Sequence, residues 1–162
     1  MKRIGFTGTR EGMTEQQKVY LESYFKMLIS LDKEGSDFYF HHGDCIGADQ
    51  QAHRIFYDKV GGTLIYLHPP ENDKLRAKLD SECYHVYPAK PYLQRNFDIV
   101  SATDFLIAAP KEAEETVKSG TWATIRYAEN QKKNVVIIRP DGSVIFRDNE
   151  EKDDGDPEQA SE

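Results

Sequence analysis

Three segments of the chain combine glycine with hydroxyl or charged side chains, a composition suited to binding an anion. They are residues 7–10 (Thr-Gly-Thr-Arg), residues 43–49 (Gly-Asp-Cys-Ile-Gly-Ala-Asp) and residues 119–122 (Ser-Gly-Thr-Trp). Each follows an expected strand and leads into an expected helix. Glycine lets the backbone approach a phosphate closely, and a helix N-terminus offers free amides. The sequence therefore predicts that the three loops build a pocket for a phosphate-bearing molecule.

Charged side chains in and near these loops complete the predicted site. Arg10 and Arg95 can each hold a phosphate through two hydrogen bonds, and neither lies on a predicted apolar face, so both are expected to be dispensable for folding. Asp44 and Asp49 are candidates to bind a ribose hydroxyl; the alternative for Asp49 is an acid that complements a helix dipole. The predicted ligand-binding residues are Thr7, Gly8, Thr9, Arg10, Gly43, Asp44, Gly47, Asp49, Arg95, Asn96, Gly120 and Thr121.

Other chemistries find little support in the sequence. The dinucleotide fingerprint G-x-G-x-x-G, the P-loop and the G-x-S-x-G nucleophile elbow are all absent. The spacing of His41, His42 and Cys45 fits no standard metal site, and Cys45 has no clear base partner for nucleophilic catalysis. Trp122 fits either base stacking or core packing, and packing is favoured. We therefore expect no metal and no cofactor, and no catalytic residue is assigned.

Charge divides the 162-residue chain into two parts. Residues 148–162 hold eight acids and one base, which accounts for the whole net charge of −7. The expected domains are thus a ligand-binding domain over residues 1–147 and an acidic, disordered tail over residues 148–162. A neutral body argues against nucleic acid as a partner. Two cysteines without a disulfide pattern, and no apolar run of roughly 20 residues, favour a cytoplasmic protein without a membrane partner.

Apolar periodicity alternates between strands and helices. Strands are expected at 3–7, 38–41, 63–67, 104–109 and 134–138, with two short ones at 84–87 and 144–146; helices are expected at 14–32, 47–60, from 91 onward and at 119–132. A polar insert at 68–82 interrupts the pattern. This alternation predicts an α/β protein, a Rossmann-like three-layer sandwich with a mostly parallel central sheet. Ligands of such sheets bind beyond the carboxyl ends of the strands.

Four motifs occur in the order seen in a known superfamily. They are Gly-Phe-Thr-Gly-Thr-Arg at 5–10, Gly-Asp-Cys-Ile-Gly-Ala-Asp-Gln-Gln-Ala at 43–52, Gln-Arg-Asn at 94–96 and Ser-Gly-Thr at 119–121. In this order the chain resembles the SLOG superfamily over residues 3–139, and most of all its YspA/YpsA-related Rossmann-like proteins. It resembles the LOG nucleotide phosphoribohydrolases and DprA more distantly. The resemblance implies a pocket for a nucleotide or a nucleotide-derived small molecule.

The resemblance to LOG enzymes bears on catalysis. Gly120 and Thr121 match the end of the LOG motif P-G-G-x-G-T-x-x-E, and Arg95 matches the arginine before it, but Thr124 occupies the position of the catalytic glutamate. A threonine supplies no carboxylate for cleavage of a glycosidic bond. A sensor, carrier or sequestering protein is therefore favoured. The alternatives are a hydrolase of the N-glycosidic bond of a nucleoside monophosphate or related nucleotide and, third, a DprA-like binder of single-stranded nucleic acid.

A homodimer is also expected. The helices from Pro91 and Ser119 carry apolar residues on more than one face. Such helices need a second surface to cover them. LOG-like relatives commonly pair through helices that flank the site, and twofold assemblies are the commonest.

Overall fold

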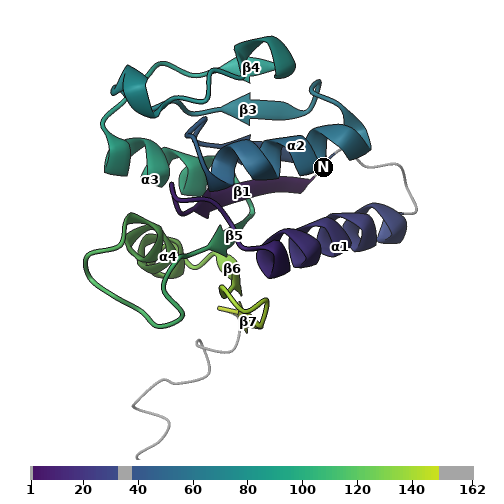
Figure 1. Cartoon of the computed structure of the whole chain (residues 1–162), viewed down its shortest axis with the longest axis vertical. Helices are drawn as coiled ribbons and strands as arrows, with labels where there is room; N and C mark the ends of the chain where they lie inside the picture. The colour runs from purple at the N-terminus through teal and green to yellow at the C-terminus, as the bar shows by residue number, and fades with distance from the viewer. Residues whose placement is uncertain (1, 33–37, 150–162) are drawn as a thin grey trace, which may run out of the picture.

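The structure is a computed structural model that describes residues 2–32 and 38–149. Within these residues, seven strands form one sheet in the order β4-β3-β2-β1-β5-β6-β7 (Figure 1). All neighbouring pairs are parallel except β6 and β7, which are antiparallel. The strands are β1 (Lys2–Gly8), β2 (Phe38–His42), β3 (Ile65–Leu67), β4 (His85–Val86), β5 (Phe105–Ala109), β6 (Asn134–Ile138) and β7 (Val144–Arg147).

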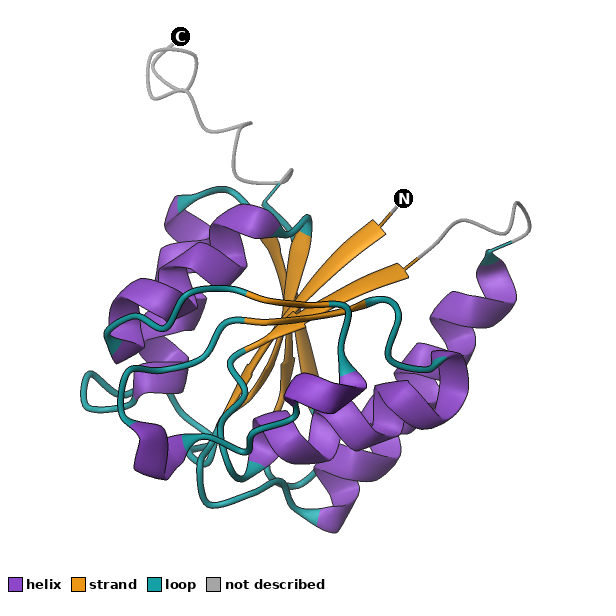
Figure 2. Ribbon diagram, turned by 90° about the horizontal axis from the view of Figure 1, so that it is seen from above, coloured by secondary structure: helices purple, strands orange, loops and turns teal. Residues whose placement is uncertain are grey.

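Helices cover both faces of the sheet, as Figure 2 shows in the view from above. The four α-helices are α1 (Glu15–Leu31), α2 (Ala48–Val60), α3 (Tyr92–Ala102) and α4 (Gly120–Asn130). Helices α1 and α2 pack together on one face, and α3 and α4 pack together on the other. This arrangement confirms the Rossmann-like three-layer fold with a mostly parallel sheet. None of the helices in the described part of the chain combines the length and apolar character needed to cross a bilayer.

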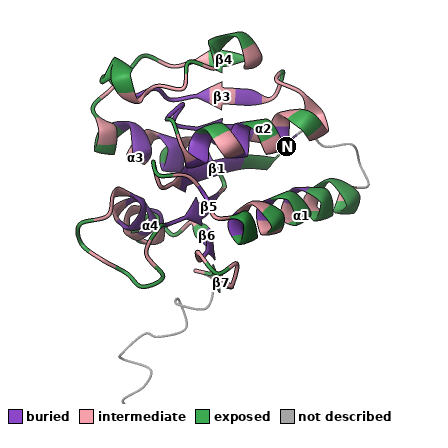
Figure 3. Ribbon diagram, viewed as in Figure 1, coloured by how far each residue is buried: buried purple, intermediate pink, exposed green. Residues whose placement is uncertain are grey.

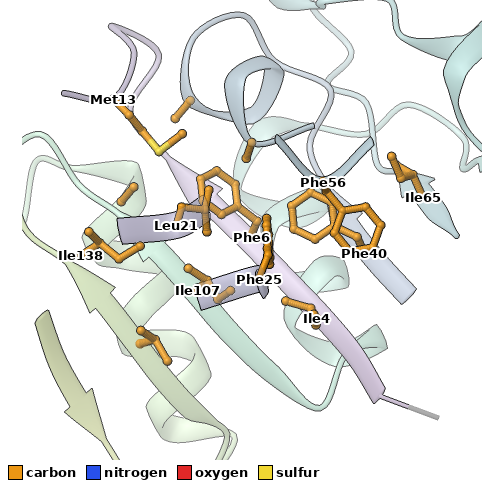
Figure 4. Close-up of a cluster of buried hydrophobic side chains, with 14 of the residues drawn as sticks. Ile4, Phe6, Met13, Leu21, Phe25, Phe40, Phe56, Ile65, Ile107 and Ile138 are labelled. Carbon is orange, nitrogen blue, oxygen red and sulfur yellow. The ribbon is translucent and has the colours of Figure 1, made fainter. Parts of the chain in front are cut away.

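The larger core lies between the sheet and the helices α1 and α2. Aromatic rings from four elements meet there: Phe25 and Phe40 lie edge to face at 5.5 Å, and Phe40 stacks on Phe56 at 4.8 Å beside Phe6 (Figure 4). Each fully buried side chain of this size contributes about 2 kcal/mol through the hydrophobic effect. Figure 3 shows this burial along the central strands, with exposed residues on the outer faces of the helices, in the loops and on the edge strands.

A second, smaller core lies under α4. Strand β5 serves both cores because successive side chains point to opposite faces, so that Ile107 joins the larger cluster and Leu106 the smaller. This explains why the segment at 104–109 is almost wholly apolar. Trp122 packs in the smaller core, as the sequence analysis predicted in preference to base stacking.

The start of α1 is fixed by a capping box, which the spacing of Thr14 and Gln17 in the sequence predicts. The Gln17 amide N–H donates to Thr14 Oγ1 at 3.1 Å, and the Thr14 N–H donates to Gln17 Oε1 at 2.9 Å. The buried side-chain amide of Gln17 also donates to the carbonyls of Pro110 and Ile138, both at 2.9 Å. One residue therefore caps the helix and joins it to the ends of β5 and β6.

Several boundaries differ from the expected ones. Strand β3 begins at Ile65 rather than Thr63, and β4 spans only His85 and Val86. The sequence pattern within the insert predicts a single helical turn around residues 74–79. The structure has two short 3-10 turns there, Asp73–Leu75 and Asp80–Glu82. Of the acidic tail, only residues 148 and 149 lie within the described residues.

Helices α3 and α4 cover much of each other's apolar surface. Ile99 and Trp122 are 1% exposed, and the rings of Phe97 and Tyr127 stack at 4.1 Å. Leu93 remains 44% exposed. Contacts within the chain thus account for most of the surface on which the expected homodimer was based. The homodimer stays a prediction, which light scattering tests against the 18.6 kDa of one chain.

Four buried histidines form two hydrogen-bonded pairs around β2. His41 Nδ1 lies 2.9 Å from His68 Nε2, and His42 Nε2 lies 2.9 Å from His53 Nδ1 on α2. Burial lowers the pKa of His41 to about 4 and that of His68 to about 3, with further lowering by neighbouring cations. Burial also lowers the pKa values of His42 and His53. The fold therefore holds these rings in their neutral form.

These pairs predict that the protein loses stability in mild acid. Below about pH 6.5 the unfolded chain binds protons that the buried rings do not, so the free energy of unfolding falls as the pH drops toward about 4. The slope is at most about 1.4 kcal/mol per pH unit for each histidine. Asp49, whose pKa burial raises to about 6, opposes this between about pH 4 and 6, because there the folded state binds the additional proton.

Urea unfolding at a series of pH values measures this dependence. His85→Asn is the matched control, because His85 is exposed on β4, and it should leave the slope unchanged. A free energy of unfolding that stays constant between about pH 6.5 and 4.5 would show that the four rings are not held neutral.

Candidate functional site

The three predicted loops meet at one edge of the sheet. Strand β1 pairs in parallel with both β2 and β5, so the carboxyl ends of the three strands lie side by side. The Thr9 N–H donates to the Ala109 carbonyl at 3.1 Å, and the Thr9 carbonyl accepts from the Ala48 N–H at 3.0 Å. The loop after β1 is therefore bonded to the end of β5 and to the start of α2.

Two of the glycines allow close contact between loops. A Cβ at Gly8 would lie 2.5 Å from the Cβ of Ala48. Gly47 has a φ of +94°, and a Cβ there would lie 2.3 Å from the carbonyl oxygen of Arg10. A side chain would therefore clash at both positions, and at Gly47 it would also be strained. These glycines are required by packing of the first loop on the second.

A cavity of about 210 Å³ opens between the loop after β1 and the first turns of α3 and α4. Five of the predicted ligand-binding residues line it: Gly8, Thr9, Arg10, Gly120 and Thr121. The others in its wall are Glu11, Tyr92, Lys111, Glu112 and Ser119. The structure thus brings the first and third predicted loops together around one space.

The start of α4 gives this cavity an anion-binding end. Ser119 caps the helix, because its side chain accepts a hydrogen bond from the Trp122 N–H at 3.2 Å. The amides of Gly120 and Thr121 are the first two of the helix and have no acceptor within it. They carry the positive end of the helix dipole, which favours a negatively charged group.

Tyr92, the first residue of α3, lies close to two arginines. The guanidinium carbons of Arg10 and Arg95 are each 5.3 Å from the centre of its ring. A Cβ added to Gly120 would lie 1.9 Å from the Tyr92 hydroxyl, so this hydroxyl sits over the start of α4. Burial raises the pKa of Tyr92 above its usual value, which keeps the hydroxyl protonated and able to donate.

Sequence reasoning missed Tyr92, although a signal was present. Tyr92 precedes Arg95 by three residues, a spacing that places both side chains on the same face of a helix. Since Arg95 was a candidate site residue, this spacing also indicated Tyr92 as one.

The cavity wall contains two positively and two negatively charged side chains, but these side chains differ in whether they form ion pairs. Lys111 pairs with Glu11 at 2.8 Å in an exposed contact, which contributes little. Arg10 is exposed and makes no ion pair within the described residues; its guanidinium lies against Tyr92 instead. Arg10 therefore retains its hydrogen-bond donors for an incoming anion.

Arg95 is used inside the chain. Its side chain is buried, 3% exposed, and Nη1 donates to the carbonyls of Gly43 and His68 while Nη2 donates to Cys45 Sγ at 3.1 Å. It lines a separate cavity of about 330 Å³ beside Tyr87. The structure argues against the expectation that Arg95 is dispensable for folding, because its guanidinium joins α3 to the loops after β2 and β3.

The two candidate aspartates also bind groups of the chain itself. The buried carboxylate of Asp44 accepts from Arg76 Nε at 2.9 Å and from the Leu79 N–H at 3.0 Å, which anchors the polar insert. Asp49 is 6% exposed and accepts from the Cys45 N–H at 3.3 Å. Neither residue lines the 210 Å³ cavity.

The remaining candidates lie behind the cavity. A Cβ at Gly43 would lie 2.1 Å from Arg95 Nη1, so Gly43 makes room for the guanidinium, and Thr7 is buried in β1. Asn96 Nδ2 donates to Thr124 Oγ1 at 3.1 Å, and Thr124 Oγ1 donates to the Gly120 carbonyl at 2.9 Å. Thr124 is therefore packed between α3 and α4. Among the described residues, no group of three or more His, Cys, Asp or Glu side chains is arranged to hold a metal ion.

Comparison with known proteins supports the fold. No family model and no curated protein sequence matches the chain. The X-ray structure of TM1055, a target of the Northeast Structural Genomics Consortium, is similar with a TM-score of 0.61 at 15% sequence identity. The match covers 88% of this chain and 77% of TM1055. A likeness at this identity shows a shared fold, the Rossmann-like α/β sandwich.

Two substitutions distinguish the arginines. Arg95→Ala leaves two buried carbonyls without their donor and should lower the free energy of unfolding by about 3 kcal/mol. Arg10→Ala removes an exposed side chain and should change it by less than about 0.5 kcal/mol. Urea unfolding of both variants measures the difference. Equal effects would contradict the assignment of Arg95 as a structural clamp.

Proposed function

We propose that this chain binds a phosphate-bearing small molecule of the nucleotide or nucleotide-derived class. The ligand's phosphate would lie in the 210 Å³ cavity at the start of α4. The observation that carries the proposal is the convergence of three kinds of donor: the first amides of α4, the guanidinium of Arg10 and the hydroxyl of Tyr92. Together they present positive charge and hydrogen-bond donors to one small space.

The size of the cavity indicates how much of a ligand it encloses. Cavities that bury a drug-sized molecule measure roughly 300–1,000 Å³. At about 210 Å³, this cavity encloses the phosphate and the group attached to it. The rest of a nucleotide would extend outward over the exposed residues of the rim.

Membership of the SLOG superfamily is part of this proposal. The order of the glycine motifs and the Rossmann-like fold both support it. A binding role is favoured over LOG-type hydrolysis because Thr124 supplies no carboxylate and its hydroxyl is bonded within the helices. A sensor, a carrier and a sequestering protein all bind a ligand without converting it chemically.

Arg10→Ala tests the phosphate assignment. Loss of charge-assisted hydrogen bonds should weaken the binding of a nucleoside monophosphate by about 1.5–3 kcal/mol, or about 10- to 150-fold. Calorimetry with a panel of nucleoside monophosphates measures the change. Lys118→Ala is the matched control, since Lys118 is an exposed cation beside α4 that does not line the cavity. Unchanged affinity in the Arg10 variant would refute the site.

Incubation with nucleoside monophosphates separates binding from hydrolysis. We expect the purified chain to bind a ligand without releasing a free base, because the glutamate position holds Thr124. Chromatography of the reaction mixture detects any released base. Steady release that is lost in Arg10→Ala would instead identify the chain as an N-glycoside hydrolase.

A further inference from the structure

The loop between β5 and α4 brings a carboxylate to the candidate site. Two side chains of α4 hold this loop: Trp122 Nε1 donates to the Glu112 carbonyl at 3.2 Å, and Arg126 Nη1 donates to Glu115 Oε1 at 3.2 Å and to the Thr116 carbonyl at 3.3 Å. The first of these bonds fixes the backbone of Glu112 over the first turn of α4. Glu112 therefore lines the same cavity as Arg10 and Gly120.

One oxygen of Glu112 is unsatisfied. Its Oε2 is buried and has no hydrogen-bond partner within the described residues. A buried carboxylate oxygen in this state is unfavourable, and such atoms are uncommon in folded proteins. Neighbouring glutamates differ in this respect, because Glu11 pairs with Lys111 and Glu115 pairs with Arg126. Glu112 thus brings a buried, unpaired acceptor atom to the wall of this cavity.

A carboxylate beside an anion site restricts which ligands fit. It repels a bare phosphate, since the two groups carry like charge. It accepts a hydrogen bond from a hydroxyl, and bonds to a charged acceptor are about twice as strong as neutral ones. A ligand that satisfies both ends of the cavity therefore carries an anionic group and, close to it, a hydrogen-bond donor, and the phosphate and hydroxyl groups of a phosphorylated sugar meet both requirements.

We propose that Glu112 recognises a hydroxyl of a phosphorylated sugar, the ribose of a nucleotide, whose phosphate lies at Arg10 and the start of α4. This inference rests on the proposed function and names its ligand class more closely. It also assigns the sugar hydroxyl to Glu112 rather than to the two aspartates that the sequence suggested. Asp44 and Asp49 bind groups of the chain itself, whereas Glu112 has an acceptor to offer.

Calorimetry with three probes tests the role of Glu112. Ribose 5-phosphate, 2-deoxyribose 5-phosphate and inorganic phosphate are compared on the unaltered chain, on Glu112→Gln and on Glu112→Ala. Glu114→Gln is the matched control, because Glu114 is exposed on the same loop and does not line the cavity. The backbone of residue 112 keeps its bond from Trp122 in every variant, so folding should be retained, and urea unfolding checks this.

The unaltered chain should bind ribose 5-phosphate at least about tenfold more tightly than inorganic phosphate. Both Glu112 variants should lose most of this preference, and their affinity for inorganic phosphate should be equal or higher because the repulsion is gone. The Glu114 variant should keep the preference.

Two results would overturn the inference, and they differ in meaning. If the Glu112 variants keep the preference for ribose 5-phosphate, Glu112 does not read the sugar, while the proposed function stands. If the unaltered chain binds none of the three probes and no nucleoside monophosphate, the proposed function fails and this inference fails with it.

Discussion

The buried guanidinium of Arg95 is the interaction on which the geometry of the site depends. Arg95 belongs to α3, and its guanidinium donates hydrogen bonds to backbone carbonyls in the loops after β2 and β3. A buried cation is costly unless its donors are bonded. Here Nη1 donates to two backbone carbonyls and Nη2 to Cys45 Sγ, while Nε has no partner among the described residues. Because Tyr92 lies on the same face of α3, these bonds also hold in place the ring that contacts both Arg95 and Arg10.

Polar residues at the sheet edge thus divide into an inner and an outer set. The inner set, Arg95, Asp44 and Asp49, is buried and bonded to the chain's own backbone or side chains. The outer set, which includes Arg10 and Glu112, lines the cavity and keeps capacity for further hydrogen bonds. Substitutions in the inner set should act on stability first, whereas those of Arg10 and Glu112 should act mainly on binding.

Sequence patterns predicted the fold well because the fold follows from local periodicity. The apolar run at 104–109 and the Thr14–Gln17 capping box both have the structure that their residue types imply. The edge where the loops meet was predictable too, since parallel strands share one carboxyl end. The sequence did not predict which group each polar side chain would bond. Arg10 and Arg95 look alike in sequence, and Asp44 finds Arg76 across 32 positions, in a segment without periodicity.

One of the histidine pairs, His42 and His53, forms a chain of hydrogen bonds in which every donor and acceptor can be assigned. The Asp44 N–H donates to His42 Nδ1, so the hydrogen of His42 lies on Nε2 and is donated to His53 Nδ1. The hydrogen of His53 then lies on Nε2, 3.3 Å from Glu82 Oε2 near the surface. The His42 ring cannot turn over without breaking the bonds on both of its sides. The hydrogen between the two rings should therefore exchange slowly with water and give a separate, downfield nuclear magnetic resonance signal.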